Sequence, residues 1–147
     1  KNMLLRDLQA ARYIINNPLW NGKDLTISGG SQGAFQATAV AALCKKATEL
    51  NITIPWLCDI GGETSGRINS NFRPSFTEAL SYYDTVSFAA MLNKSCNVKI
   101  EAGLGDRTCP PSGVTALYNA IKAPKSILFT QNRTHEYSPE IAFVYEK

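Results

Sequence analysis

The stretch that most constrains the fold is 25–34, with the sequence LTISGGSQGA. It starts with strand formers, continues with a G-x-S-x-G pattern centred on Ser31, and runs into an alanine-rich segment of helical composition. A strand, a sharp turn and a helix in this order place the serine on a strained elbow at the carboxyl end of a sheet. Glycines at 29 and 33 leave room for close strand–helix packing. We therefore predict that Ser31 is a nucleophile and that the Gln32 amide, at a helix N-terminus, stabilises an oxyanion. A plain Gly/Ser turn is the alternative, and the flanking strand and helix signals weigh against it.

Helix and strand signals alternate along the rest of the chain. We expect helices at 2–16, 35–50, 75–92, 110–121 and from Ser138 onward, and strands from Leu25 and at 52–58, 98–104 and 126–130. Such alternation predicts an α/β fold, a parallel sheet with crossover helices on both faces. The 147 residues are one domain's length, so we expect a single domain over 1–147.

Composition excludes several partners and cofactors. The net charge of +3 is scattered along the chain, which argues against nucleic acid and anionic membranes, and no apolar run is long enough to cross a bilayer. The four cysteines form no C-x-x-C or Cys/His cluster, so we expect free thiols, no metal site and no cofactor. The chain starts at Lys1 without a visible signal peptide, which leaves cytoplasmic and periplasmic or secreted locations open.

A serine nucleophile needs a base, and the base needs an acid that holds its tautomer. The single histidine, His135, lies in a loop just past the last predicted parallel strand, at the sheet edge expected for Ser31. Asp106 follows the preceding strand, and the order Ser31, Asp106, His135 is that of α/β-hydrolases. We predict that these three residues form a catalytic triad. Asp59 also follows a strand and competes for the acid's role, whereas Asp84 lies in a helical segment and is less well placed.

Five stretches together resemble the acetyl xylan esterases and cephalosporin C deacetylases of carbohydrate esterase family seven. They are GGSQG at 29–33, PWLC at 55–58, LSYYD at 80–84 with Phe88-Ala89, GLGDRTCPPS at 103–112 with Ala116, Tyr118 and Asn119, and His135-Glu136. The stretch around Asp106 is the most specific, because D-x-x-C-P-P-S followed by a Y-N helix is not general among α/β-hydrolases.

The resemblance implies a serine esterase that removes acetyl groups from sugar hydroxyls, with a small acylated carbohydrate as substrate. Ser31 would be the nucleophile, His135 the general base and acid, Asp106 the orienting acid, and the Gln32 amide one oxyanion donor. The sequence departs from the family at Ala34, in place of a glycine, and at Ser87, where asparagine is common. Lys99 and Glu101 also make the strand before Asp106 unusually polar.

Length is the larger departure, because the family fold is an eight-stranded sheet of about twice this size. The chain matches only the carboxyl-terminal half of an α/β-hydrolase, so 1–147 would be a partial domain. The other half would carry the first strands and the second oxyanion donor. An unpaired internal sheet edge invites pairing. We therefore expect completion by an amino-terminal half, by another copy of the chain, or by both.

Two other functions remain open at this stage. A serine peptidase of the prolyl-oligopeptidase type would share the elbow and the order of the triad. A non-catalytic hydrolase-like assembly module would have no use for an intact set of Ser31, Asp106 and His135.

Overall fold

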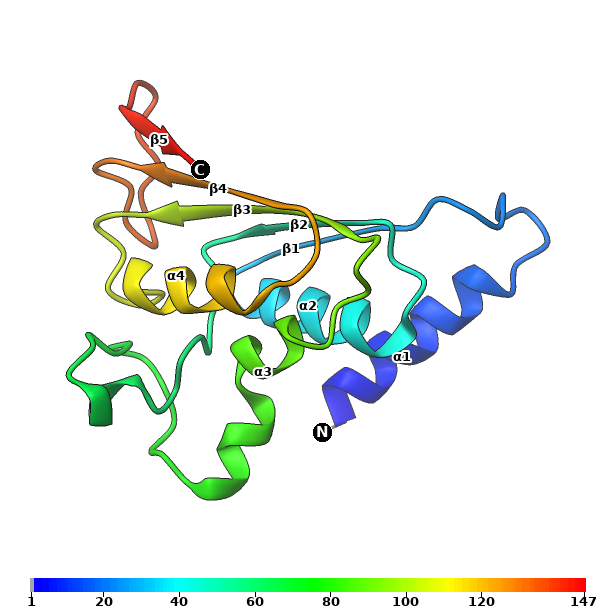
Figure 1. Cartoon of the computed structure of the whole chain (residues 1–147), viewed down its shortest axis with the longest axis horizontal. Helices are drawn as coiled ribbons and strands as arrows, with labels where there is room; N and C mark the ends of the chain where they lie inside the picture. The colour runs from blue at the N-terminus through cyan, green and yellow to red at the C-terminus, as the bar shows by residue number, and fades with distance from the viewer. Residues whose placement is uncertain (1) are drawn as a thin grey trace.

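The computed structural model describes residues 2–147 and contains one five-stranded sheet with the strand order β1-β2-β3-β4-β5 (Figure 1). The first four strands are parallel, and β5 runs antiparallel to β4. The strands are β1 (Thr26–Gly30), β2 (Glu49–Thr53), β3 (Asn97–Gly103), β4 (Lys125–Thr130) and β5 (Val144–Glu146). The α/β class and the mostly parallel sheet confirm the prediction.

One helix precedes β1, and the others lie between consecutive parallel strands, as crossover connections require. They are α1 (Asn2–Ile15), α2 (Gln32–Cys44), α3 (Thr85–Ala89) and α4 (Pro111–Ala120), with the short 3₁₀ turns η1 (Gly62–Ser65) and η2 (Glu78–Tyr83). The helix expected over 75–92 is thus two shorter pieces. Asp84 separates them, because its carboxylate accepts the N–H of Val86 and caps α3.

All four α-helices lie on one face of the sheet (Figure 1). Strand side chains that point to this face form the core with the small residues of α2 and the apolar face of α4. The largest buried members are Leu50, Ile52, Val98, Val114, Leu117 and Ile127. Phe35 and Ala39 of α2 pack against Leu4 of α1 in a second, smaller cluster. The apolar period of α4 and of the strands therefore explains which side each buries, whereas α2 is apolar all round and packs on both the sheet and α1.

The opposite face of the sheet carries no helix within residues 2–147, so the expectation of helices on both faces is wrong for this part of the chain (Figure 1). Most of its side chains are polar, which lets water cover them. Lys99 pairs with Glu49 across β3 and β2, with Nζ to Oε1 at 2.8 Å, and Arg133 pairs with Glu101. The polarity of β3 noted in the sequence therefore belongs to a solvated sheet face.

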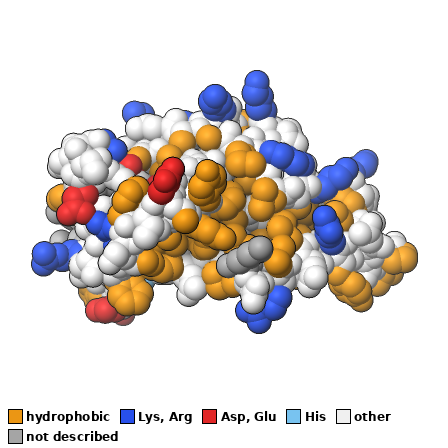
Figure 2. All heavy atoms as spheres, turned by 90° about the horizontal axis from the view of Figure 1, so that it is seen from below, with side chains coloured by type: hydrophobic (Ala, Val, Ile, Leu, Met, Phe, Trp, Pro, Cys, Tyr) orange, Lys and Arg blue, Asp and Glu red, His pale blue; other side chains and the backbone are white. Residues whose placement is uncertain are grey.

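The helical side looks different. Figure 2 shows hydrophobic side chains across the middle of this side, with Lys and Arg around them. The helices of this side do carry exposed apolar residues, including Leu5 and Ile14 of α1 and Leu43 of α2.

Two sequence expectations fail at element ends. The predicted final helix from Ser138 is absent, because 144–146 pairs with β4 as β5. The helix expected to reach Leu50 ends at Cys44, where Lys45 adopts a left-handed conformation, and β2 begins at Glu49. Leu50 is therefore a fully buried strand residue.

The outer edge of β1 is open. Within residues 2–147, β1 pairs with β2 alone. A groove of about 380 Å³ runs between this edge, α1 and α2, and it is lined mostly by apolar residues such as Ala10, Ile14, Leu25, Ile27 and Val40. In the part of the chain described, no helix has the length and apolarity that crossing a membrane requires.

Candidate active site

Ser31 stands between β1 and α2 in a conformation that L-residues rarely adopt, with φ 52° and ψ −118°. Hydrogen bonds hold this strained backbone in place. The Ser31 N–H donates to the Thr53 carbonyl at 3.0 Å, and the Ser31 carbonyl accepts the Trp56 N–H at 3.2 Å. The side chain makes no capping bond to α2. The strain therefore leaves the Ser31 hydroxyl pointing away from its own helix.

Gly29 is required at this turn by close contact. A Cβ on Gly29 would lie 2.2 Å from the Gly33 carbonyl oxygen, far inside van der Waals contact. A Cβ on Gly33 would meet nothing within 4 Å. The strand–helix approach expected at the elbow thus depends on Gly29, and the predicted steric need for Gly33 is wrong.

His135 reaches Ser31 from the loop after β4. Its Nε2 lies 2.9 Å from the Ser31 Oγ. The loop is tied to the one after β3, because the Gly105 N–H donates to the Arg133 carbonyl at 2.9 Å. A Cβ on Gly103 would lie 2.6 Å from that same carbonyl oxygen. Glycine at 103 thus lets the two loops approach closely enough for the imidazole to reach the serine.

Asp106 holds the other side of the imidazole, with Oδ2 3.0 Å from the His135 Nδ1. Its Oδ1 accepts the backbone N–H groups of Thr108 and Cys109 at 2.8 and 2.7 Å. The Asp106 side chain is fully buried, whereas 23% of the His135 side chain is exposed. Three hydrogen bonds compensate the carboxylate for lost water.

Neither competing carboxylate contacts the histidine. Asp59 forms a two-point ion pair with Arg67, at 2.5 and 3.0 Å. Asp84 accepts the N–H groups of Asp59, Ile60 and Val86 and organises the loop after β2. Burial raises the pKa of Asp84 above its ordinary value, despite these bonds. Of the three acids considered in the sequence, the structure brings only Asp106 to His135.

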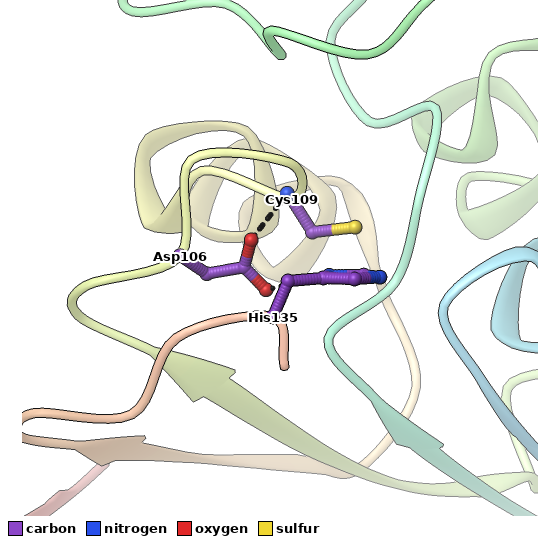
Figure 3. Close-up of side chains that lie close together, drawn as sticks. All are labelled: Asp106, Cys109 and His135. Atoms are coloured by element: carbon purple, nitrogen blue, oxygen red, sulfur yellow. Dashed lines mark hydrogen bonds and ion pairs between the residues drawn. The ribbon is translucent and has the colours of Figure 1, made fainter. Parts of the chain in front are cut away.

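Cys109 completes the buried side of the site. Its Sγ lies within 4.8 Å of ligand atoms of Asp106 and His135, and Figure 3 shows the thiol beside the imidazole. Burial, followed by the charge of Asp106, raises the pKa of the thiol to about 12. A metal would need a thiolate here and a carboxylate already engaged in three hydrogen bonds. The cluster is therefore better suited to holding the imidazole than to binding zinc.

Gln32 begins α2, directly after Ser31. Backbone N–H groups in the first turn of a helix have no acceptor within the helix, and the helix dipole favours negative charge there. The Gln32 backbone N–H therefore lies where the sequence predicts an oxyanion donor.

An open cleft of about 450 Å³ lies over Ser31 and His135. Five further residues line it with Gln32, and none of them is among the site residues predicted from the sequence: Trp56, Asn71, Phe72, Thr108 and Glu136. The strand predicted at 52–58 places Trp56 inside a strand, and this boundary is wrong. The strand ends at Thr53, so Trp56 follows it at the same edge as Ser31. A strand predicted to end at Thr53 would have placed Trp56 among the residues of the catalytic edge.

The family model described as acetyl xylan esterase (AXE1) matches residues 1–64 and 69–146. The chain belongs to the acetyl xylan esterase family. This confirms the resemblance seen in the sequence.

Among curated relatives of this family, the acetyl esterase Axe7A of Xylanibacter ruminicola is 31% identical over 144 residues, covering 92% of this chain and 32% of that protein. Among solved structures, acetyl xylan esterase 1 from Thermoanaerobacterium sp. JW/SL YS485 is 26% identical, with a TM-score of 0.78 and coverage of 93% and 48%. The acetyl xylan esterase from Paenibacillus sp. R4 shares the fold at 23% identity, with a TM-score of 0.77 and coverage of 92% and 48%. The chain thus spans between a third and a half of the length of these relatives.

Proposed function

We propose that this chain carries the catalytic centre of a serine esterase that hydrolyses acetyl esters on carbohydrates. The continuous path from the Ser31 Oγ through the His135 ring to the Asp106 carboxylate is the observation that carries the proposal. The names of the relatives, acetyl esterase and acetyl xylan esterase, support the substrate class.

The first step forms an acetyl-enzyme. Ser31 Oγ attacks the ester carbonyl while His135 Nε2 accepts the hydroxyl proton. Asp106 keeps the remaining imidazole proton on Nδ1 and stabilises the imidazolium. The Gln32 amide donates to the developing oxyanion. His135 then gives its proton to the departing sugar hydroxyl.

The second step releases acetate. Water takes the place of the sugar, His135 accepts a proton from it, and the hydroxide attacks the acetyl carbonyl. Collapse of the tetrahedral intermediate returns the proton to the Ser31 oxygen. No step requires a metal or an organic cofactor.

We further propose that the open edge of β1 pairs with a strand from outside residues 2–147. A second oxyanion donor is expected from the same source, because one backbone N–H is fewer than acyl transfer sites ordinarily use. The remaining length of the family members supports an amino-terminal half as that source. A second copy of the chain is the alternative.

A substrate panel tests the function. The parent chain and Ser31→Ala are each incubated with three substrates: acetylated xylo-oligosaccharides, p-nitrophenyl acetate and a prolyl peptide amide. We expect hydrolysis of the two acetyl esters and its loss in Ser31→Ala. Cleavage of the peptide alone would favour the peptidase. If Ser31→Ala hydrolysed the esters as fast as the parent, Ser31 would not be the nucleophile, and a non-catalytic assembly module would be the better account.

A further inference from the structure

Phe72 is an exposed aromatic side chain next to the catalytic cleft. It lies between β2 and η2, and 68% of it is exposed to solvent. It lines the same cleft as Ser31 and His135. An exposed aromatic ring in a concave, otherwise mixed site marks a surface that a ligand can cover.

The Trp56 ring packs against the Phe72 ring. The two rings stack with centroids 5.9 Å apart and an interplanar angle of 29°. The Trp56 Nε1–H also donates to the Phe72 carbonyl at 2.7 Å. Offset stacking and this hydrogen bond fix the orientation of Phe72 relative to the loop that follows β2.

The segment is also tied to the loop that carries Asp106. The Asn71 N–H donates to the Arg107 carbonyl at 3.0 Å, and the Thr108 hydroxyl donates to the Asn71 side-chain oxygen at 3.3 Å. Since Asp106 holds His135, the same loop sets the position of both the reacting groups and Phe72. A ligand on this ring would therefore lie at a defined place relative to Ser31.

Polar groups line the same cleft. Asn71, Thr108 and Glu136 contribute an amide, a hydroxyl and a carboxylate. A pyranose ring has C–H groups on its faces and hydroxyls around its rim, so it combines an aromatic contact with polar contacts at the edge. A purely apolar acyl chain would cover the Asn71 amide N–H groups and the Glu136 carboxylate without offering them a hydrogen bond.

We propose that Phe72, supported by Trp56, is a platform for the sugar ring of the substrate, and that Asn71 and Glu136 bind its hydroxyls. The proposal rests on the proposed function, since it concerns the same cleft. It adds the site at which the carbohydrate is held and predicts a pyranose oligosaccharide such as xylotriose as ligand.

Binding of xylotriose to Ser31→Ala, measured by isothermal titration calorimetry, tests the platform without catalysis. In this background we expect Phe72→Ala to weaken binding about tenfold, because it removes the stacking surface. Phe72→Tyr should retain the affinity. Phe76→Ala is the matched control, since Phe76 is also exposed and lies on the same segment outside the cleft.

Equal affinity of Phe72→Ala and Phe76→Ala for xylotriose would overturn the proposal. So would the absence of xylotriose binding to Ser31→Ala itself. Thermal unfolding of each variant checks that the fold is intact. A serine-hydrolase probe on the chain with Ser31 intact separates the two proposals. If Phe72→Ala lost sugar binding and Ser31 was never labelled, the proposed esterase activity would be contradicted and the proposed sugar platform would be supported.

Discussion

The carboxyl end of the sheet and the outer edge of β1 differ in how completely this chain builds them. At the carboxyl end, a backbone hydrogen bond joins the loops after β3 and β4, and side-chain hydrogen bonds bring Ser31, His135 and Asp106 into one path. At the edge, the backbone of β1 faces an apolar groove without a strand partner among residues 2–147. The groups proposed for catalysis are thus assembled within a sheet that has one open side.

The difference shows that assembly of the site depends on the connections after the strands. Each proposed catalytic residue follows a strand that pairs on at least one side inside the chain, and β2 holds Ser31 through the Thr53 carbonyl. The open edge can therefore affect stability and oligomeric state more than the geometry of the triad.

The largest expected effect is at the carboxyl end. Asp106→Asn should lower the rate of p-nitrophenyl acetate hydrolysis by about 10⁴-fold, because the amide favours the wrong histidine tautomer. Asp59→Asn is the matched control, since Asp59 also follows a strand but binds Arg67. Its rate should stay within about threefold of the parent, because Asp59 contacts Arg67 and neither His135 nor Ser31. An equal loss of hydrolysis rate in both variants would contradict the assignment of Asp106, and not Asp59, as the acid that orients His135.

The second comparison sets the sheet interior against its edge. Leu50→Ala in β2 should lower the free energy of unfolding by about 3 kcal/mol, because Leu50 is fully buried and leaves a cavity. Ile27→Ala in β1 should cost about 1 kcal/mol, since Ile27 is only partly buried beside the groove. Chemical denaturation measures both. A cost for Ile27→Ala as large as that of Leu50→Ala would mean that the β1 edge is covered in solution.

The elbow joins the two regions and offers a matched pair of glycines. Gly29→Ala should cost about 2 kcal/mol and reduce labelling of Ser31, because the new Cβ would collide with the Gly33 carbonyl. Gly33→Ala has open space and should raise stability by up to about 1 kcal/mol, since alanine favours the helix. Thermal unfolding and probe labelling test the pair, and the reverse ranking would contradict the packing at the turn.

The smallest effect, taken per pH unit, is on alkaline stability. The pKa of the Cys109 thiol is raised to about 12 in the fold, so its contribution is fully present below the pKa of an unfolded thiol, near 8.5, and is lost as pH rises from there towards 12. The free energy of unfolding should fall by about 1.4 kcal/mol per pH unit for this thiol. Cys109→Ala should make the decline shallower by that amount. An unchanged slope would mean that the thiol is not buried as described.

Much of the fold follows from local patterns. The elbow, α1, α4, β3 and β4 were predictable because apolar periodicity and turn residues agree there. The end of the chain was not, since Ser138-Pro139-Glu140 is a good helix start and only pairing with β4 selects a strand at 144–146. The bare sheet face was indicated for one strand, since Lys99 and Glu101 alternate with Val98 and Ile100 as in a strand with one solvated face.

The order of the triad residues could also be predicted from the sequence, whereas the aromatic platform could not. Ser31, Asp106 and His135 each stand just after a predicted strand, so their meeting at one edge follows from a parallel sheet. Phe72 lies in a long irregular loop whose path depends on hydrogen bonds to Trp56 and to Arg107. Such contacts between distant segments leave no periodic signal in the sequence.

Covalent labelling of the 147-residue chain with a fluorophosphonate serine-hydrolase probe tests the central claim most directly, with the modified residue mapped by mass spectrometry. We predict a single label on Ser31, strongly reduced in His135→Ala and unchanged in Asp59→Asn. A label on another serine, or on Ser31 at the same rate in His135→Ala, would contradict the account.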